Sequence, residues 1–224
     1  ANGSSTGFVR VFAWDDGTSD WQQRDQLNGL VAHNNFGRSV ALNADGSVIA
    51  VGAPGMAHNG IPYAGYLNVW SWSDGAYVEN AGYPVYGEQS SDQFGDYVAL
   101  SADGLVVAAA ARNASQPGVA QTEGMGYVRV FAHNGEERGE RIWASYREDI
   151  TSSVALSADG SVVAIGSEKH DLDGTTSRHE NRGHVRVFAF NSETDEWGLV
   201  GQEDMIGEAG GDYLGIRVSL SGDG

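Results

Sequence analysis

Apolar and polar positions alternate with a period of two in short runs along this chain, and glycine-rich turns separate the runs. Valines alternate with Phe, Arg and Trp from Phe8 to Trp14, and the same pattern returns from Tyr66 to Trp72. Alternation of this kind is typical of a β-strand with one buried face. No window of useful length shows the 3.6-residue period of a helix. The pattern therefore predicts an all-β protein.

Hairpins are predicted where an Asp-Gly turn separates two apolar runs. In the first copy, Ser39 to Leu42 and Val48 to Val51 flank Ala44-Asp45-Gly46. Glycine tolerates the positive φ of a tight turn, so this arrangement is a strong hairpin signal. A fourth, weaker strand is predicted around Trp21 to Gln23 and again around Trp197 to Val200. The equivalent turn aspartates of the four copies are Asp45, Asp103, Asp159 and Asp223.

These strands recur with a long period. The sequence segment that begins at Gly7 recurs at Gly65, Gly126 and Gly183, in steps of 58, 61 and 57 residues. Four antiparallel strands in each period is the pattern of a β-propeller blade. We predict one β-propeller segment over residues 1–224, present as about 3.7 repeats of a ~58-residue, four-stranded blade. The predicted repeats cover about 7–64, 65–125, 126–182 and a truncated 183–224. The apolar run Leu105 to Ala111 suits a strand covered on both faces.

The first copy reads FGRSVALNADGSVIAVGAP from Phe36 to Pro54. It resembles the FG-GAP repeat of integrin α-chain propellers and related extracellular proteins. The resemblance covers nearly the whole chain. The second copy keeps Phe94 and Gly95, and the third has no Phe-Gly pair.

In that family the FG strand is the innermost of its blade, and the GAP strand and then the V-R-V-F strand follow outward. The resemblance implies that the chain begins with two outer strands, contains three whole blades and ends on an inner strand, Tyr213 to Leu220. We therefore expect these residues to be part of a longer array or chain. A seven-bladed ring is usual for the family.

The net charge is −17, from 30 acidic and 13 basic residues, and Lys169 is the one lysine. Nucleic acid and anionic membranes both require a positive field, so we expect neither as a partner. The acidic residues are interpreted as an ordinary solvated surface. Binding of divalent cations and adaptation to high salt are the alternative explanations of the charge. Cysteine is absent, so no disulfide contributes. No apolar run approaches the ~20 residues of a membrane helix, so we expect no membrane insertion.

Two glycosylation sequons occur, Asn2-Gly3-Ser4 and Asn113-Ala114-Ser115. The repeat alignment places both in the loop that joins the second strand to the third. We predict glycans on Asn2 and Asn113. Together with the resemblance, the sequons favour an extracellular location, secreted or on the cell surface.

Calcium is the first metal to consider, because many FG-GAP repeats resemble an EF-hand loop at the Asp-Gly turn. Each turn here supplies one carboxylate, whereas calcium requires several oxygens at alternate positions. The family's calcium sites are therefore not carried over, and the turn aspartates are interpreted as hairpin residues. We expect no cofactor.

A weak metal candidate lies in a polar segment that contains His170, Asp171 and Asp173, followed by His179, Glu180 and His184. Carboxylates of this pattern form half of a calcium loop, and with histidine they suit a transition metal. The alternative is a long polar loop with ordinary turn chemistry. Calcium at this segment is the one cofactor that the sequence leaves open.

Arg10, Arg129 and Arg186 occupy one repeat position, where the second copy has Asn68. A recurring arginine could bind carboxylates or sulfates of a glycan. The alternative is a structural role in ion pairs or in stacking on aromatic rings. Trp72 poses the same choice between stacking on sugars and packing between blades, as do the tryptophans on other outer strands. These are Trp14, Trp70, Trp143 and Trp197.

No catalytic signature is present. The sequence has no Cys nucleophile, Gly-x-Ser-x-Gly elbow, His-Glu-x-x-His pair or phosphate-binding glycine loop. Glu136, Glu137, Glu148 and Asp149 are acidic neighbours, but a glycosidase is defined by the distance between its carboxylates. We predict that the chain is not an enzyme.

The predicted function is a non-enzymatic extracellular scaffold for adhesion, matrix or surface-filament assembly, with ligands displayed on inter-blade loops. Its partners would be other proteins, copies of itself or glycans. Unpaired terminal strands could complete a blade of a neighbouring copy. The alternatives are a glycan-binding, lectin-like propeller and an accessory domain of a secreted enzyme.

Overall fold

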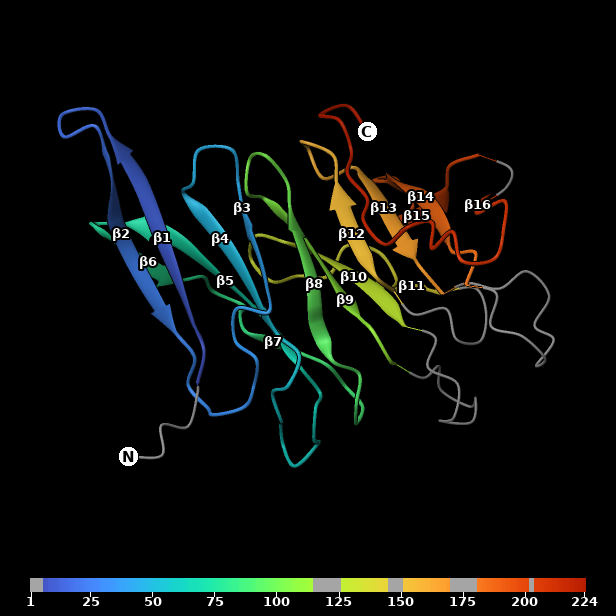
Figure 1. The fold of residues 1–224 in the computed structure, drawn as a ribbon, viewed down its shortest axis with the longest axis horizontal. Helices are drawn as coiled ribbons and strands as arrows, with labels where there is room; N and C mark the ends of the chain where they lie inside the picture. The colour runs from blue at the N-terminus through green and yellow to red at the C-terminus, as the bar shows by residue number, and fades with distance from the viewer. Residues whose placement is uncertain (1–5, 115–125, 145–150, 170–180, 202–203) are drawn as a thin grey trace.

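The computed structural model describes residues 6–114, 126–144, 151–169, 181–201 and 204–224 (Figure 1). These segments contain β-strands, turns and loops and no helix. The strands form four antiparallel sheets, so the prediction of an all-β protein is confirmed. Within the same segments, no helix has the length and apolar character needed to cross a membrane.

The sheets follow one another in chain order. The first sheet contains β1 (Phe8–Asp15) and β2 (Asp20–Asn28). The second has the order β3 (Ser39–Leu42), β4 (Val48–Ala53), β5 (Tyr66–Ser73) and β6 (Ala76–Glu79), with β7 (Val85–Tyr86) paired to β5. The third has the order β8 (Phe94–Leu100), β9 (Val106–Ala111), β10 (Tyr127–Ala132) and β11 (Ile142–Trp143). The fourth has the order β12 (Ser153–Leu156), β13 (Val162–Ser167), β14 (His184–Asn191) and β15 (Glu196–Leu199), with β16 (Met205–Ile206) paired to β14.

The hairpin prediction is confirmed at the first Asp-Gly turn, where β3 pairs antiparallel with β4 from Ser39 opposite Gly52 to Leu42 opposite Ile49. In the second sheet, β3, which follows the Phe36-Gly37 pair, lies at one edge and is followed by β4, β5 and β6. The weakly predicted fourth strands form as β2 and β15.

The predicted inner strand from Tyr213 to Leu220 is wrong. Leu214 forms an isolated parallel bridge with Gly183, and no strand is present over the rest of this segment. A strand requires a neighbour for its backbone N–H and C=O groups. No described strand lies beside this segment in the place that β9 takes beside β8, so an extended ladder does not form.

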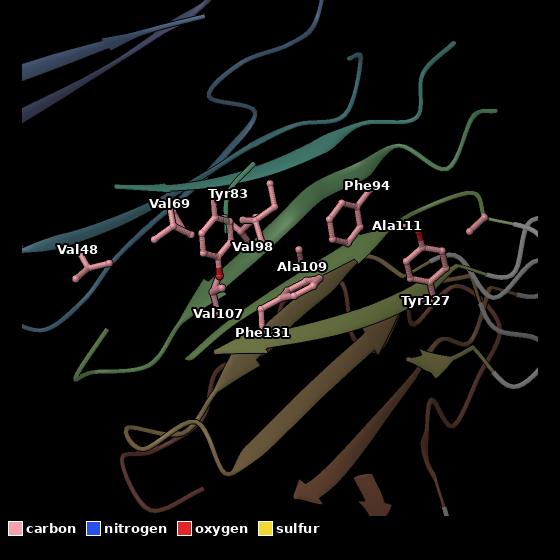
Figure 2. Packing of buried hydrophobic residues seen from close by; sticks show 13 residues of the cluster. Val48, Val69, Tyr83, Phe94, Val98, Val107, Ala109, Ala111, Tyr127 and Phe131 are labelled. Atoms are coloured by element: carbon pink, nitrogen blue, oxygen red, sulfur yellow. The ribbon is translucent and has the colours of Figure 1, made fainter. Parts of the chain in front are cut away.

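Each pair of neighbouring sheets buries an apolar layer between them. Between the second and third sheets, Tyr127 and Phe131 of β10 pack against Leu67 and Val69 of β5, and all four side chains are at most 1% exposed. Figure 2 shows Tyr127 and Phe131 with Val48, Val69 and Phe94 in this layer. Burial of one such side chain contributes about 1.5–3 kcal/mol. The sheets therefore stabilise one another through their faces.

Turn-to-turn hydrogen bonds join the repeats at one end of the sheets. The backbone N–H of Ala44 donates to the carbonyl of Ala102 at 3.0 Å, that of Ala102 to Ala158 at 2.8 Å, and that of Ala158 to Gly222 at 2.9 Å. The turns between β3 and β4 and between β8 and β9 lie at the upper end of Figure 1, and the loops that precede β3 and β8 lie at the lower end. We call these the turn end and the loop end.

A substitution of Gly52 in β4 tests how closely the second and third sheets approach each other. A Cβ atom at this position would lie 1.9 Å from the backbone carbonyl oxygen of Gly95 in the next sheet. We expect Gly52→Ala to lower the free energy of unfolding by about 3 kcal/mol or more, because backbone atoms must move. Urea denaturation followed by tryptophan fluorescence measures the change.

Gly198→Ala in β15 is the matched control, because its Cβ would meet only the carbonyl oxygen of Ala189, at 3.9 Å. This variant should unfold within about 0.5 kcal/mol of the original chain. Equal stability of the two variants would contradict the close approach at Gly52.

Candidate functional site

A pocket of about 680 Å³ opens at the loop end, between the first, second and third sheets. It lies where the loops before β3, β5 and β8 meet the segments that follow β4 and β9. Its volume is within the range of small-ligand sites. We call it the loop pocket and define it by its polar and aromatic lining: His33, Asn35, Arg38, Tyr63, Gln93, Asp96 and Arg112.

Left-handed backbone conformations concentrate around the loop pocket. The φ angles are 63° at His33, 57° at Asn35, 53° at Tyr63 and 54° at Gln93. For residues other than glycine, this conformation costs on the order of 1–3 kcal/mol each, and such strain clusters at functional sites. The pocket is therefore the strongest candidate site on backbone grounds.

Buried hydrogen bonds hold these strained loops. Asn34 is 2% exposed, its side-chain oxygen accepts from the backbone N–H of Phe36 at 3.1 Å, and its carbonyl accepts from Gly55 at 3.0 Å. The backbone N–H of Gln93 donates to the carbonyl of Tyr63 at 3.0 Å. The side chains of the pocket thus project from loops of fixed shape.

A chain of charges forms the floor of the pocket. Asp96 is 5% exposed and lies between Arg38 (Nε to Oδ1, 3.1 Å) and Arg112 (Nη1 to Oδ2, 3.6 Å). Arg112 continues to Glu168 at 3.8 Å. The hydrogen bond to Asp96 raises the pKa of Arg38, whose side chain is half exposed. Arg38 therefore remains a partly exposed cation at the pocket.

A second cavity of about 330 Å³ adjoins this floor and runs along the edge strands β3, β8 and β12. It shares Arg38 and Asp96 with the loop pocket and adds Tyr97, Ser153 and Arg217. The two cavities together offer amide, guanidinium, imidazole and phenol donors beside one buried carboxylate. This set can hydrogen-bond a ligand with several hydroxyl groups or with one anionic group.

The recurring arginines serve the packing of the sheets in two of the three copies. Arg129 donates to both carboxylate oxygens of Glu137, at 2.9 and 2.7 Å, and to the carbonyl of Tyr86 at 3.3 Å. Arg186 donates to the carbonyl of Trp143 at 3.0 Å. Arg10 is exposed. Its one described hydrogen bond goes to Gln26, at 2.8 Å. None of the three lines the loop pocket.

The tryptophans also lie outside the loop pocket. Trp72 packs on Tyr77, with ring centroids 5.1 Å apart, and Arg24 lies 3.8 Å over its ring. Trp70, Trp143 and Trp197 pack against the apolar layers between sheets. Trp14 differs, since it is 50% exposed on β1.

The turn aspartates accept hydrogen bonds from their own turns. Asp159 Oδ1 accepts from the backbone N–H of Ser161 at 2.9 Å and from the hydroxyl groups of Ser161 and Ser157 at 2.7 and 2.8 Å. These bonds lower the pKa of Asp159 to about 2. Hydrogen bonds also lower the pKa of Asp45, mainly from Ser47, and of Asp223, mainly from Ser221. The carboxylates thus close the hairpin turns.

The remaining predicted site residues are only partly described. Asn2 and the metal candidates His170, Asp171 and Asp173 lie outside the described residues, as do His179, Glu180, Glu148 and Asp149. Asn113 is half-buried, and its side-chain nitrogen donates to Gln93 Oε1 at 2.9 Å. A glycan on Asn113 would replace this bond, so its glycosylation stays a prediction.

The residues of the loop pocket form no sequence motif, so the sequence did not predict this site. Asn35 and Gln93 share one repeat position, directly before the Phe-Gly pair, but they differ in type. One signal was present: Gly37 follows Gly29 by eight positions, and Gly95 follows Gly87 by the same step. Loops of constant length with polar tips are where function commonly lies.

No protein-family model and no curated protein matches this sequence. Solved structures with a similar fold include the hydrazine synthase of Kuenenia stuttgartiensis, at 14% identity and a TM-score of 0.50, over 85% of this chain and 47% of that chain. A protein of Bacteroides fragilis provisionally described as a 6-phosphogluconolactonase is similar at 13% identity and a TM-score of 0.57, over 94% of this chain and 50% of that chain. The chain spans about half the length of both structures. At these identities the likeness concerns the fold alone.

The second comparison corrects the prediction that the chain is not an enzyme. A fold shared with a protein that is described as a lactonase gives no support to the prediction that this chain is non-enzymatic. The prediction was wrong because it took the lack of a sequence motif as evidence. Catalytic groups on loops of such a fold are brought together in space and leave no local pattern.

Asp92 supports the loop that precedes β8. Its side chain is fully buried, and Oδ2 accepts from the backbone N–H groups of Glu88 and Gln89, each at 3.0 Å, and from the hydroxyl of Tyr127 at 3.1 Å. Oδ1 has no hydrogen-bond partner among the described residues. Burial raises the pKa of Asp92 because it disfavours the carboxylate. Asn34 takes the equivalent place in the first loop.

A raised folded-state pKa means that the carboxyl group stabilises the fold most at acid pH, and that this contribution is lost as pH rises through that pKa. Asn is neutral and keeps an acceptor oxygen, so Asp92→Asn should gain stability relative to the original chain between about pH 4 and pH 7. Asp92→Ala leaves three donors without an acceptor and should cost about 2–3 kcal/mol at pH 4. The cost should be smaller at pH 7, because this variant also lacks the titrating carboxyl group. Urea unfolding at each pH measures both changes. A pH-independent difference between Asp92→Asn and the original chain would contradict the burial effect.

Proposed function

We propose that the four sheets are successive blades of a β-propeller and that the chain is an extracellular repeat scaffold that presents a ligand site on its loops, in adhesion or matrix assembly. Two features support the propeller. The strand order recurs from sheet to sheet, and the solved structures of similar fold are propeller-like. The FG-GAP resemblance of Phe36 to Pro54 supports the extracellular setting.

The loop pocket is the observation that carries this proposal. It draws residues from successive repeats. Asn35 and Arg38 come from the segment before β3, Gln93 directly precedes β8, and Asp96 lies in β8. A rigid stack of sheets holds these loops in fixed relative positions. Binding groups are commonly presented in this way, on loops that a scaffold positions.

A glycan is the ligand class that the pocket favours. Tyr63 is 55% exposed and presents a ring to the pocket, and amides of Asn35 and Gln93 lie along the same lining. Aromatic rings contact the apolar face of a sugar, while amide and guanidinium groups bind its hydroxyl or carboxylate groups. Arg38 and Asp96 supply a donor and an acceptor in one contact. The site of this lectin-like function is then the loop pocket, and neither the recurring arginines nor the tryptophans take part.

A printed glycan array, together with a panel of matrix proteins, tests the proposal. Tyr63→Ala and Arg38→Ala should each weaken binding of a glycan hit by about tenfold or more, which corresponds to about 1.4 kcal/mol. Tyr213→Ala is the matched control. Tyr213 is also exposed and has a φ of 51°, but it lies outside the loop pocket. Binding of the control should equal that of the original chain.

Three outcomes count against the proposal. Signals at background on every glycan would exclude the glycan ligand, and signals at background on the matrix proteins as well would exclude ligand display. Binding that Tyr63→Ala and Arg38→Ala leave unchanged would place the site elsewhere.

A further inference from the structure

A groove of about 980 Å³ runs along the outer strand β15, between the third and fourth sheets. Residues 139–143 of the third sheet form one wall, and β14, β15 and the turn between them form the other. Its volume is at the upper end of the range of ligand sites. We call it the outer groove. It shares no lining residue with the loop pocket and is therefore a separate candidate site.

The outer groove exists because the outer part of the third repeat is short. Equivalent backbone hydrogen bonds mark the two ends of this part: Gly87 donates to Gly65 at 3.1 Å in the second sheet, and Ala144 donates to Gly126 at 3.2 Å in the third. These ends are 22 positions apart in the second sheet and 18 in the third. The third sheet has the two-residue β11 where the second has both β6 and β7. The described outer strand of the third sheet is thus too short to cover β15.

The first and second sheets show what a complete outer strand does. In the nine-residue β2, Asp25 accepts a hydrogen bond from the backbone N–H of Tyr77 in β6, at 2.8 Å. Trp197 of β15 takes the place of Tyr77, since each lies opposite an aromatic residue whose ring centroid is 5.1 Å away. Among the described residues, none of the third sheet accepts a hydrogen bond from the backbone N–H of Trp197. The equivalent donor is therefore left open at the outer groove.

The free edge of β15 presents backbone groups to the groove. Phe190 donates its backbone N–H to Ser161 at 2.8 Å, away from β15, so Phe190 and the opposite Trp197 exchange no hydrogen bond. The N–H and C=O of Trp197 then point away from β14, as do those of Leu199 two residues later. No described strand pairs with β15 on that side. Residues 196–200 all line the groove although successive side chains point to opposite faces, so the groove includes this edge.

Two hydrogen bonds join the walls of the outer groove beside the turn between β14 and β15. The indole Nε1 of Trp197 donates to the carbonyl of Arg138 at 2.8 Å, and the backbone N–H of Gly139 donates to Asp195 Oδ1 at 3.1 Å. The two walls are therefore held at a fixed separation. A preformed site of this kind loses little conformational freedom when a ligand binds.

The lining of the outer groove has an excess of free negative charge. Its two arginines, Arg141 and Arg186, already donate to acceptors of the protein. Glu140 and Glu196 are exposed, and neither carboxylate has a partner within the described segments. The net charge of −17 adds a field of the same sign. Basic side chains therefore complement this groove.

We propose that the outer groove binds an extended, basic peptide segment of a partner protein, which pairs with the free edge of β15 as an added strand. The backbone of the peptide hydrogen-bonds the outward groups of Trp197 and Leu199, and its basic side chains pair with Glu140 and Glu196. In such contacts main-chain pairing supplies affinity and side chains supply specificity. A second copy of this chain is a poorer occupant, because its own β15 edge is equally acidic. The inference does not rest on glycan binding in the loop pocket.

The probe is a fluorescently labelled peptide in which valine alternates with lysine, and fluorescence anisotropy at about 0.15 M salt measures its binding. Leu199→Pro removes an outward N–H of β15 and keeps the pairing with β14, because an edge strand tolerates proline on its outer side. We expect this variant to bind about tenfold more weakly, or worse. Leu199→Val is the matched control. It keeps the N–H and should bind within about twofold of the original chain. Circular dichroism verifies the fold of both.

Charge variants test the acidic lining separately. Glu140→Arg/Glu196→Arg should weaken binding by about fivefold or more. Glu136→Arg/Glu208→Arg makes the same change of net charge at exposed positions outside the groove, and should alter binding by less than about twofold. A peptide in which valine alternates with glutamate should not bind the original chain. Tyr63→Ala should leave peptide binding unchanged, which keeps this result independent of the glycan experiment.

Four outcomes would overturn the proposal. The first is that the lysine peptide does not bind the original chain. The second is equal binding by Leu199→Pro and Leu199→Val, because no strand would then be added to β15. The third is an equal effect of the two charge variants, which would reduce binding to the general charge of the chain. The fourth is self-association of the original chain that Leu199→Pro abolishes while the peptide fails to compete, which would assign the edge to a second copy.

Discussion

The packing of an aromatic face on a branched aliphatic face is the contact on which the rest of this structure depends. Each sheet presents different residue types on its two sides: Tyr127 and Phe131 point toward the preceding sheet, and Val128 and Val130 point toward the following one. A single sheet of this kind cannot bury both faces alone. The fold is therefore a property of the series of sheets, and the loops keep their shape because the sheets beneath them are fixed against one another.

Much of the fold could be predicted from the sequence because strand periodicity is local. The alternation in Phe8 to Trp14 and the Asp-Gly turn after Leu42 specify strands and hairpins without reference to distant residues. The segment Tyr213 to Leu220 carries the same pattern and still does not form a strand. Its pairing depends on a neighbouring strand, and that information is absent from the local pattern.

The candidate site could not be predicted in the same way. His33, Asn35, Tyr63 and Gln93 adopt left-handed conformations that are uncommon for residues other than glycine, and they meet only because three sheets stack. The recurring arginines were predicted as candidate site residues because they repeat. In the structure, Arg129 and Arg186 recur because the same packing contact between sheets recurs. In a repeat protein, residues that differ between copies are the better guide to function, and Arg38 and Asp96 are such a pair.

The hydrogen bonds between turns have a direction. Each turn donates its N–H to the next turn along the chain, from Ala44 to Ala102 to Ala158 to Gly222, and the acceptor is always an equivalent carbonyl. The hydrogen bond between two successive turns uses equivalent atoms at each place in the series. A whole repeat can therefore be lost or duplicated without leaving a turn donor or acceptor unmatched within the series. The turn end thereby permits the number of repeats to change in evolution, while the loop end, whose residues differ from copy to copy, is free to diverge.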